Sequence, residues 1–397
     1  MSLVLTAIVV IATPFSVIIF LLSAVLLAEV LFSVQYPSFS DTEPGFYPAT
    51  TVLVPAHNES TNLSLTLSDI AAQLRPSDKC LVIADNCSDD TADVARQAGI
   101  AVIERNDSHK IGKGYALDFG IRHLEASPPG VVIVIDADCR LAPRAIALLA
   151  SASYRRNKPV QALDLMVAPN NASPVAKVSE FAWRVKNYVR PLGLKKMGLP
   201  CHLMGTGMAF PWQIAKSMKA ATGNIVEDLR IGLDLTKEGN AAEFYPTAVV
   251  TSSFPNSQET SQRQRQRWET GHLASIANLA PRLFWSSIVS RNLNLVALTI
   301  DMSVPPITIF LMIITSGLFA SALLVLAGVS STPFVFFGSS FFFVFSALSL
   351  AWWRFGRTIL PTSQLHLICI YLARKAVQYL NTAIHGGATE WTKTNRD

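Results

Sequence analysis

Two stretches of the chain contain no charged side chain, and each is long enough for a membrane. The first runs from Ser2 to Ala28, and the second runs from Met302 to Trp353. A helix needs about 20 apolar residues to cross the hydrocarbon core of a bilayer. The first stretch is long enough for one span, with a kink expected at Pro14, and the second is long enough for two spans separated near 328–333. The pattern predicts three transmembrane helices.

The alternative for the first stretch is a cleaved signal peptide. Such a peptide has a basic start, a shorter apolar core and a small-residue cleavage site. No Lys or Arg precedes this stretch, which favours a retained span.

The orientation of the spans follows from the basic residues after the third one. These residues are Arg354, Arg357, Arg374 and Lys375. Because cytoplasmic loops carry an excess of Lys and Arg, the third span is expected to end in the cytoplasm. Counting back through two spans places the central domain in the cytoplasm and the amino terminus outside. We expect a multi-pass protein of the inner cell membrane.

Between the spans the hydrophobic pattern changes to short apolar runs that alternate with helical stretches. The expected strands are Thr51–Val54, Leu81–Ala84, Ala101–Ile103 and Val131–Ile135, and the expected helices are Thr61–Leu74, Thr91–Ala98 and Gly114–Leu124. This alternation predicts an α/β domain with a mainly parallel sheet and helices on both faces. We expect three parts: a span at 1–33, a cytosolic domain at 45–281, and a membrane region at 282–397 with two spans and an interfacial helix.

Two further segments mix apolar and basic residues. In Val175–Arg190 and in Leu365–Leu380 the apolar positions are interleaved with Lys, Arg or His. Each segment fits a helix in the headgroup plane as well as it fits an amphipathic helix on the domain core.

Composition supports the membrane assignment. Half of the 397 residues are hydrophobic and 15% are charged, whereas a soluble protein carries about 25% charged residues. The net charge of +5 fits anionic lipid or phosphate at least as well as nucleic acid, and we expect no nucleic-acid partner. The five cysteines form no CxxC pair, which indicates neither a disulfide framework nor a zinc site.

Polar residues follow the expected strands, where ligands of parallel α/β sheets bind. Asp136 and Asp138 end a strongly apolar strand, and two carboxylates so close need a cation or hydrogen bonds to compensate them. A divalent ion shared with a diphosphate would do so, although such pairs also occur in ordinary loops. Asp85 ends another strand, is not needed to cap the next helix, and could accept a base N–H group.

Three more groups carry candidate chemistry, each with an ordinary alternative. Lys113 between Gly112 and Gly114 can meet a phosphate, or belong to a plain loop. Glu227-Asp228 opens a helical run, where acidic residues are common, but such a carboxylate could also deprotonate an acceptor hydroxyl. Arg267-Trp268 offers a diphosphate contact and a stacking surface, or lies on a solvated face.

The order of these motifs resembles that of the family 2 glycosyltransferases with a GT-A fold. The motifs are Val54-Pro55-Ala56-His57-Asn58-Glu59, Asp85, Gly112-Lys113-Gly114, Asp136-x-Asp138, Glu227-Asp228 and Gln264-x-x-Arg267-Trp268. The similarity extends from about Pro48 to Trp268. It is greatest to the membrane-bound branch that contains cellulose synthases, hyaluronan synthases and ceramide glucosyltransferase. The tail Trp391–Arg396 resembles that of bacterial polysaccharide members, or is an ordinary polar terminus.

The resemblance implies a role for each motif residue. Glu59 and Asp85 would hold the uridine, Lys113 would meet the donor phosphates, and Asp136 and Asp138 would bind the diphosphate, with Mg²⁺ or Mn²⁺ on Asp138. Asp228 would be the catalytic base. Gln264, Arg267 and Trp268 would bind the diphosphate and the acceptor end.

The leading hypothesis is an inverting transferase. It would move a sugar from a nucleotide sugar, with UDP as the expected nucleotide, to a lipid-linked or growing glycan acceptor. Proteins of polysaccharide synthesis or export are candidate partners. Three spans are few for secretion of a polymer through this chain alone. The alternative is a membrane-anchored nucleotide-binding partner of a polysaccharide synthesis complex without catalysis, which would have no need of Asp228 together with Gln264-x-x-Arg267-Trp268. A transporter is disfavoured because no expected span carries a buried charge pair, and Asp301 lies at the edge of one.

Overall fold

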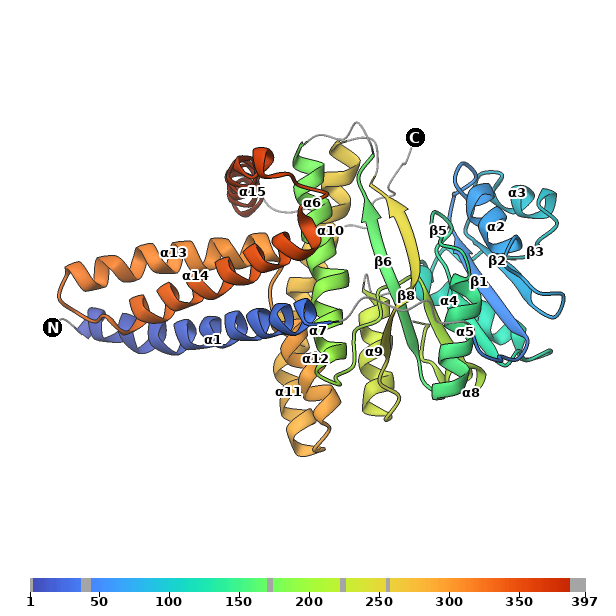
Figure 1. The fold of residues 1–397 in the computed structure, drawn as a ribbon, viewed down its shortest axis with the longest axis horizontal. Coiled ribbons are helices and arrows are strands. Elements are labelled where there is room, and N and C mark those ends of the chain that lie inside the picture. The colour runs from blue at the N-terminus through green and yellow to red at the C-terminus, as the bar shows by residue number, and fades with distance from the viewer. Residues whose placement is uncertain (1–2, 37–43, 170–173, 222–225, 255–257, 386–397) are drawn as a thin grey trace.

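The computed structural model describes residues 3–36, 44–169, 174–221, 226–254 and 258–385. It contains an α/β domain and a bundle of three long helices that projects from that domain (Figure 1). Between the two lies a layer of helices that runs across the ends of the bundle and not along them.

The domain is built on an eight-stranded mixed sheet in the described part of the chain. Its strands are β1 (Thr50–Ala56), β2 (Lys79–Asp85), β3 (Ala101–Arg105), β4 (Val131–Val134), β5 (Arg140–Leu141), β6 (Val160–Val167), β7 (Met208–Pro211) and β8 (Glu243–Ser253), in the order β3-β2-β1-β4-β7-β6-β8-β5. The four predicted strands are β1 to β4, and they pair in parallel. β7 then runs antiparallel to both of its neighbours, and β5 runs antiparallel to β8.

Helices cover both faces of the sheet, as predicted. They are α2 (Leu63–Ala71), α3 (Thr91–Gln97), α4 (Lys113–Leu124), α5 (Ala145–Arg156), α8 (Trp212–Ser217) and α9 (Glu227–Lys237). Because successive strand residues point to opposite faces, β1 serves both layers. Val52 and Val54 pack with α2 and α5, whereas Leu53 packs with α4 and α9.

The three long helices are α1 (Leu3–Val34), α13 (Ile307–Leu326) and α14 (Thr332–Ala351), and α14 lies between the other two (Figure 1). Within the described residues, three segments are long and apolar enough to cross a membrane: Thr6–Val34, Ile307–Leu326 and Thr332–Gly356. Large apolar side chains such as Ile11 and Phe342 point outward and are exposed. An apolar surface of this kind favours lipid as its surroundings.

The layer across the bundle contains both predicted amphipathic segments. It is made of α6 (Pro174–Arg184), a π-helical turn (Val185–Val189), α7 (Arg190–Lys196), α10 (Gln258–Asn278), α11 (Ala280–Val289), α12 (Leu293–Ser303) and α15 (His366–His385). Phe181 and Val185 are buried against the long helices. In α15, Lys375 forms an ion pair with Glu269 of α10 at 2.8 Å. The tail Trp391–Arg396 lies outside the described residues.

Glu29 corrects the expectation that no span carries a buried charge pair. It lies inside the candidate span Thr6–Val34, and its Oε2 is 2.7 Å from Nε of Arg190. The same guanidinium contacts Asp301 of α12 at 2.6 Å, and His202 lies 3.0 Å from the other oxygen of Asp301. The expectation was wrong because the uncharged stretch ends at Ala28 while the helix continues to Val34.

Candidate active site

A cavity of about 790 Å³ opens beyond the carboxyl ends of β1, β2 and β4 and extends to the layer of crosswise helices. Its lining includes seven of the predicted site residues: Glu59, Asp85, Lys113, Asp136, Asp138, Asp228 and Trp268. The side chains of Gln264 and Arg267 lie outside the described part of the structure. The fold therefore brings to one cavity residues that are more than 200 positions apart in the sequence.

One end of the cavity is formed by the loops after β1 and β2. The carboxylate of Asp85 is buried and lies 2.6 Å from Nη1 of Arg105. His57 Nδ1 is 2.7 Å from the carbonyl oxygen of Asp85, which ties the two loops together. The backbone N–H of Glu59 donates to Thr91 Oγ1 at 2.9 Å. This end presents acceptor oxygens held by a network of hydrogen bonds.

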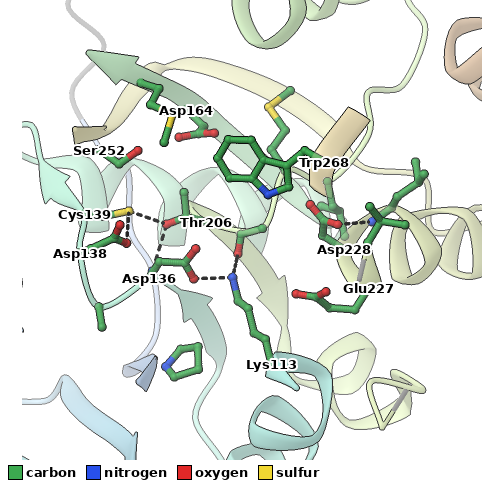
Figure 2. Close-up of a pocket in the computed structure, with 18 of the residues that line it drawn as sticks. Lys113, Asp136, Asp138, Cys139, Asp164, Thr206, Glu227, Asp228, Ser252 and Trp268 are labelled. Atoms are coloured by element: carbon green, nitrogen blue, oxygen red, sulfur yellow. Dashed lines mark hydrogen bonds and ion pairs between the residues drawn. The ribbon is translucent and has the colours of Figure 1, made fainter. Parts of the chain in front are cut away.

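Lys113 stands at the start of α4 and reaches into the middle of the cavity (Figure 2). Its Nζ forms an ion pair with Asp136 and donates to the carbonyl oxygen of Gly205 at 2.8 Å. Burial acts to lower the pKa of Lys113, but Asp136 and Glu227 outweigh it and raise that pKa. Gly112 before it has φ of 135° with open space around the missing Cβ, so its backbone is accessible to a ligand. The centre of the cavity thus holds the ammonium group of Lys113, stabilised by Asp136, beside an open backbone.

Asp136 and Asp138 follow β4 and both line the cavity. The backbone N–H of Asp136 donates to Thr206 Oγ1 at 3.1 Å, and Cys139 Sγ lies 3.4 Å from the same hydroxyl (Figure 2). In the described residues no group of three or more His, Cys, Asp or Glu side chains is placed to hold a metal ion. A pair of carboxylates nevertheless fits Mg²⁺ or Mn²⁺, because such ions usually bind one or two carboxylates and take their other ligands from water and substrate phosphates. Asp136 is paired with Lys113, and Asp138 lines the same cavity.

Glu227 and Asp228 begin α9 and face Lys113 across the cavity (Figure 2). The Oδ1 of Asp228 accepts a hydrogen bond from the backbone N–H of Leu229 at 2.8 Å. The dipole of α9 favours a negative charge at this end of the helix. Burial raises the pKa of Asp228. Burial and the neighbouring Asp228 raise the pKa of Glu227 to about 7. The pKa of each carboxyl group therefore lies above its ordinary value.

The lining also includes residues that the sequence did not single out for the site. Asp164 on β6 is buried and accepts a hydrogen bond from Asn187 at 2.9 Å, and burial together with Asp136 raises its pKa to about 7. Lys186 points into the cavity from the π-helical turn. β6 was not predicted, so nothing placed Asp164 at a sheet edge. Lys186 belongs to a segment of alternating basic and apolar residues. That pattern predicted an amphipathic helix, but it gave no sign that Lys186 would line a site.

Two tryptophans from different helices meet at the cavity wall. The ring centroids of Trp183 in α6 and Trp268 in α10 are 5.0 Å apart, and Lys186 Nζ lies 5.4 Å from the centroid of Trp183. Their Trp–Trp–Lys arrangement combines an apolar face with a positive charge. Such a surface suits the apolar face of a sugar ring.

A sequence model of the family described as "Glycosyltransferase like family 2" matches residues 48–271, more than half of the chain. The chain belongs to family 2 of the glycosyltransferases. This family 2 glycosyltransferase is 23% identical over 252 residues to the probable glycosyltransferase YdaM of Bacillus subtilis strain 168. The match covers 60% of the chain and 58% of that relative's length.

The fold is similar to that of a glycosyltransferase with a solved structure. The glycosyltransferase is similar to the mannosyltransferase PcManGT from Pyrobaculum calidifontis, solved in complex with GDP-mannose and Mn²⁺, with a TM-score of 0.53. The two are 18% identical, and the match covers 88% of this chain and 99% of PcManGT. This likeness establishes a GT-A-like fold.

Proposed function

We propose that this family 2 glycosyltransferase is an inverting enzyme that moves a sugar from a nucleotide-sugar donor to a lipid-linked or growing glycan acceptor at the cytoplasmic face of the inner membrane. The observation that carries the proposal is the single cavity. It connects Asp85 at the sheet edge, through Lys113 and Asp138, to Asp228 and then to His272 and Asp301 beside the long helices. A donor and a membrane-bound acceptor can therefore meet in it.

The donor is placed along the first half of the cavity. Asp85 and Glu59 accept hydrogen bonds from the nucleoside, and Lys113 meets the diphosphate. Trp268 contacts the diphosphate and the acceptor, together with Gln264 and Arg267 from the same motif. A UDP-sugar is the first donor class to test, and a GDP-sugar is the second because PcManGT was solved with GDP-mannose.

Asp228 is the base in this proposal. It is half-buried at the cavity wall, and burial raises its pKa, which makes its carboxylate a stronger base. The acceptor hydroxyl gives its proton to Asp228 while its oxygen attacks the anomeric carbon from the face opposite to the diphosphate. The bond from that carbon to the diphosphate oxygen breaks, and Lys113 balances the negative charge that develops there. Asp136 holds Lys113 in place through their ion pair.

Asp138 would hold Mg²⁺ or Mn²⁺, with Asp136 beside it. When bound, the ion supplies positive charge to the leaving diphosphate. PcManGT was solved with Mn²⁺, which supports a divalent ion here.

We also propose that the chain is organised as a span at 1–33, a cytosolic domain from 45 and a membrane region to 397. The boundary expected at 281 falls inside α11, so we place the end of the domain before that helix, at the end of α10. We further propose that the enzyme acts together with proteins of polysaccharide synthesis or export.

The decisive experiment uses the purified full chain in lipid nanodiscs with a panel of labelled nucleotide sugars, Mg²⁺ or Mn²⁺, and lipid-linked and soluble glycan acceptors. Transfer of label to an acceptor supports the proposal. Binding of a nucleotide sugar without transfer to any acceptor on the panel would favour the non-catalytic nucleotide-binding partner instead.

A further inference from the structure

One face of the continuous helix formed by α6, the π-helical turn and α7 lines the cavity (Figure 1). The residues on this face are Trp183, Lys186, Asn187 and Arg190. Their spacing of three, one and three residues places the side chains on the same side of a helix. Lys186 and Asn187 belong to the π-helical turn, and such turns inside α-helices are frequent at functional sites. One helical face therefore supplies a wall of the site.

Two of the four side chains on this face are held by carboxylates. Nδ2 of Asn187 donates to Asp164 at 2.9 Å. The guanidinium of Arg190 pairs with Glu29 and with Asp301. These two side chains are therefore occupied with contacts inside the protein.

Lys186 has no carboxylate within ion-pair distance in the described part of the chain. The other described lysine and arginine of the lining, Lys113 and Arg190, each pair with a carboxylate. The ammonium of Lys186 is exposed to the cavity. Burial lowers the pKa of Lys186, although Asp228 acts in the other direction. A bound anion would stabilise the charged form of this lysine.

The ammonium of Lys186 stands at the edge of an apolar wall. Its Nζ lies 5.4 Å from the ring centroid of Trp183, a distance at which a cation and an aromatic ring attract each other. Trp183 and Trp268 pack against the cluster that contains Met166 of β6. In the view of Figure 2, Trp268 lies beside Asp228, the proposed base. A sugar stacked on this wall would therefore have the base and the ammonium of Lys186 around it.

We propose that Trp183 and Lys186 form an acceptor subsite for a sugar that carries a negative charge next to its ring. The apolar face of the sugar lies on the indoles, and the ammonium donates hydrogen bonds to the anion. The anion is the carboxylate of a uronic acid or the phosphate that joins a single sugar to its lipid, since both put anionic oxygens beside the ring. This inference rests on the proposed function, because it names the acceptor of the same cavity.

The test compares three acceptors with the full chain in nanodiscs, using the donor and the acceptor sugar that the panel of nucleotide sugars and acceptors identifies. The first is a neutral alkyl glycoside, the second has its C6 oxidised to a carboxylate, and the third joins the same sugar to the alkyl chain through a phosphate. Affinity is measured as KM, or as an inhibition constant against the neutral acceptor where an analogue receives no sugar. All assays are run above the acid limb of the pH profile, where Asp228 is ionised in every variant.

The wild-type enzyme should bind at least one anionic acceptor roughly tenfold or more tightly than the neutral one, the scale of one charge-assisted hydrogen bond. Lys186→Met should lose this preference, and Lys186→Arg should keep it. Trp183→Leu should weaken the binding of all three acceptors alike and leave the preference intact. The exposed change Lys196→Met is the matched control and should alter neither quantity.

The outcomes separate this inference from the proposed function. A preference for the carboxylate or for the phosphate that depends on Lys186 names the source of the anion. Equal affinity of the wild-type enzyme for neutral and anionic acceptors would overturn the inference and leave the transferase intact. So would a preference that persists in Lys186→Met, or a shifted acid limb in that variant without any change in preference, since the lysine would then serve Asp228 alone. Transfer from no donor to any acceptor would contradict the proposed function, and this inference with it.

Discussion

Asp228 and Glu227 are adjacent carboxyl groups at one helix start, yet we expect different consequences when each is replaced. Three of the other carboxylates in the motifs have partners. Asp136 pairs with Lys113, Asp85 pairs with Arg105, and Asp138 would hold the proposed ion. Asp228 is therefore our candidate for the base. Asp228→Asn should keep donor binding nearly intact and lower turnover by roughly 10²-fold or more, the scale for loss of a general base. Glu227→Gln should lower turnover less.

Titration of donor affinity together with steady-state turnover on both variants separates the roles. Wild-type turnover in Asp228→Asn would disprove the assignment. So would a loss of activity in that variant that comes entirely from failure to bind the donor.

The pH dependence of the reaction should report Asp228 and its neighbours. A base works only when ionised, and burial raises the pKa of Asp228, so activity should fall as the pH drops through that raised value. Lys186 acts to lower the pKa of Asp228, so Lys186→Met should move the acid limb to higher pH. The pH profile of kcat/KM measures this shift. Lys196→Met, an exposed change on the same run of helices, is the control, and an unmoved limb in Lys186→Met would show that Lys186 does not influence the base.

At the scale of elements, the end of β4 supplies the carboxylates proposed for the metal. Treatment with a chelator should abolish transfer, and either Mg²⁺ or Mn²⁺ should restore it. Asp138→Asn should require more ion for half-maximal activity, because one ligand loses its charge. The matched control Asp118→Asn changes a carboxylate on α4 that pairs with the exposed Arg122 and should leave the requirement unchanged. Full activity after chelation would exclude the proposed role of the ion.

The first half of the sheet was predictable from the sequence, whereas the second half was not. β1 to β4 are short apolar runs followed by helical stretches, and parallel pairing brings their ends to one edge. β6, β7 and β8 lie among segments without such a regular alternation, so their pairing depends on contacts distant in sequence. Asp164 on β6 was missed for this reason. Lys186 was missed because its direction depends on a π-helical turn, which a sequence pattern does not reveal.

At the scale of the whole molecule, Arg190 links the first span, the domain and α12. Its side chain is buried between Glu29 and Asp301. Arg190→Gln leaves the buried Glu29 without its cation, which typically costs about 3–5 kcal/mol. We expect a clear fall in the thermal unfolding temperature of the detergent-solubilised chain. The exposed pair of Arg122 and Asp118 provides the control, because Arg122→Gln should change stability little. Equal effects of the two changes would show that the buried cluster does not join the parts.

The orientation of the molecule follows from how the three long helices meet the domain. α1 enters the domain with its carboxyl end, α13 leaves from that side, and α14 returns to it (Figure 1). The basic residues Arg354 and Arg357 follow α14 on the domain side and are exposed. Because basic residues favour the cytoplasmic side, we expect the domain and the carboxyl terminus inside and the amino terminus outside. A reporter enzyme that is active only after export should therefore be inactive when fused to the carboxyl terminus. The same reporter inserted between α13 and α14, at Gly328, should be active, since that turn lies at the far end of the bundle. Activity of the carboxyl-terminal fusion, with silence of the insertion at Gly328, would invert the proposed topology and place the catalytic cavity on the outer side.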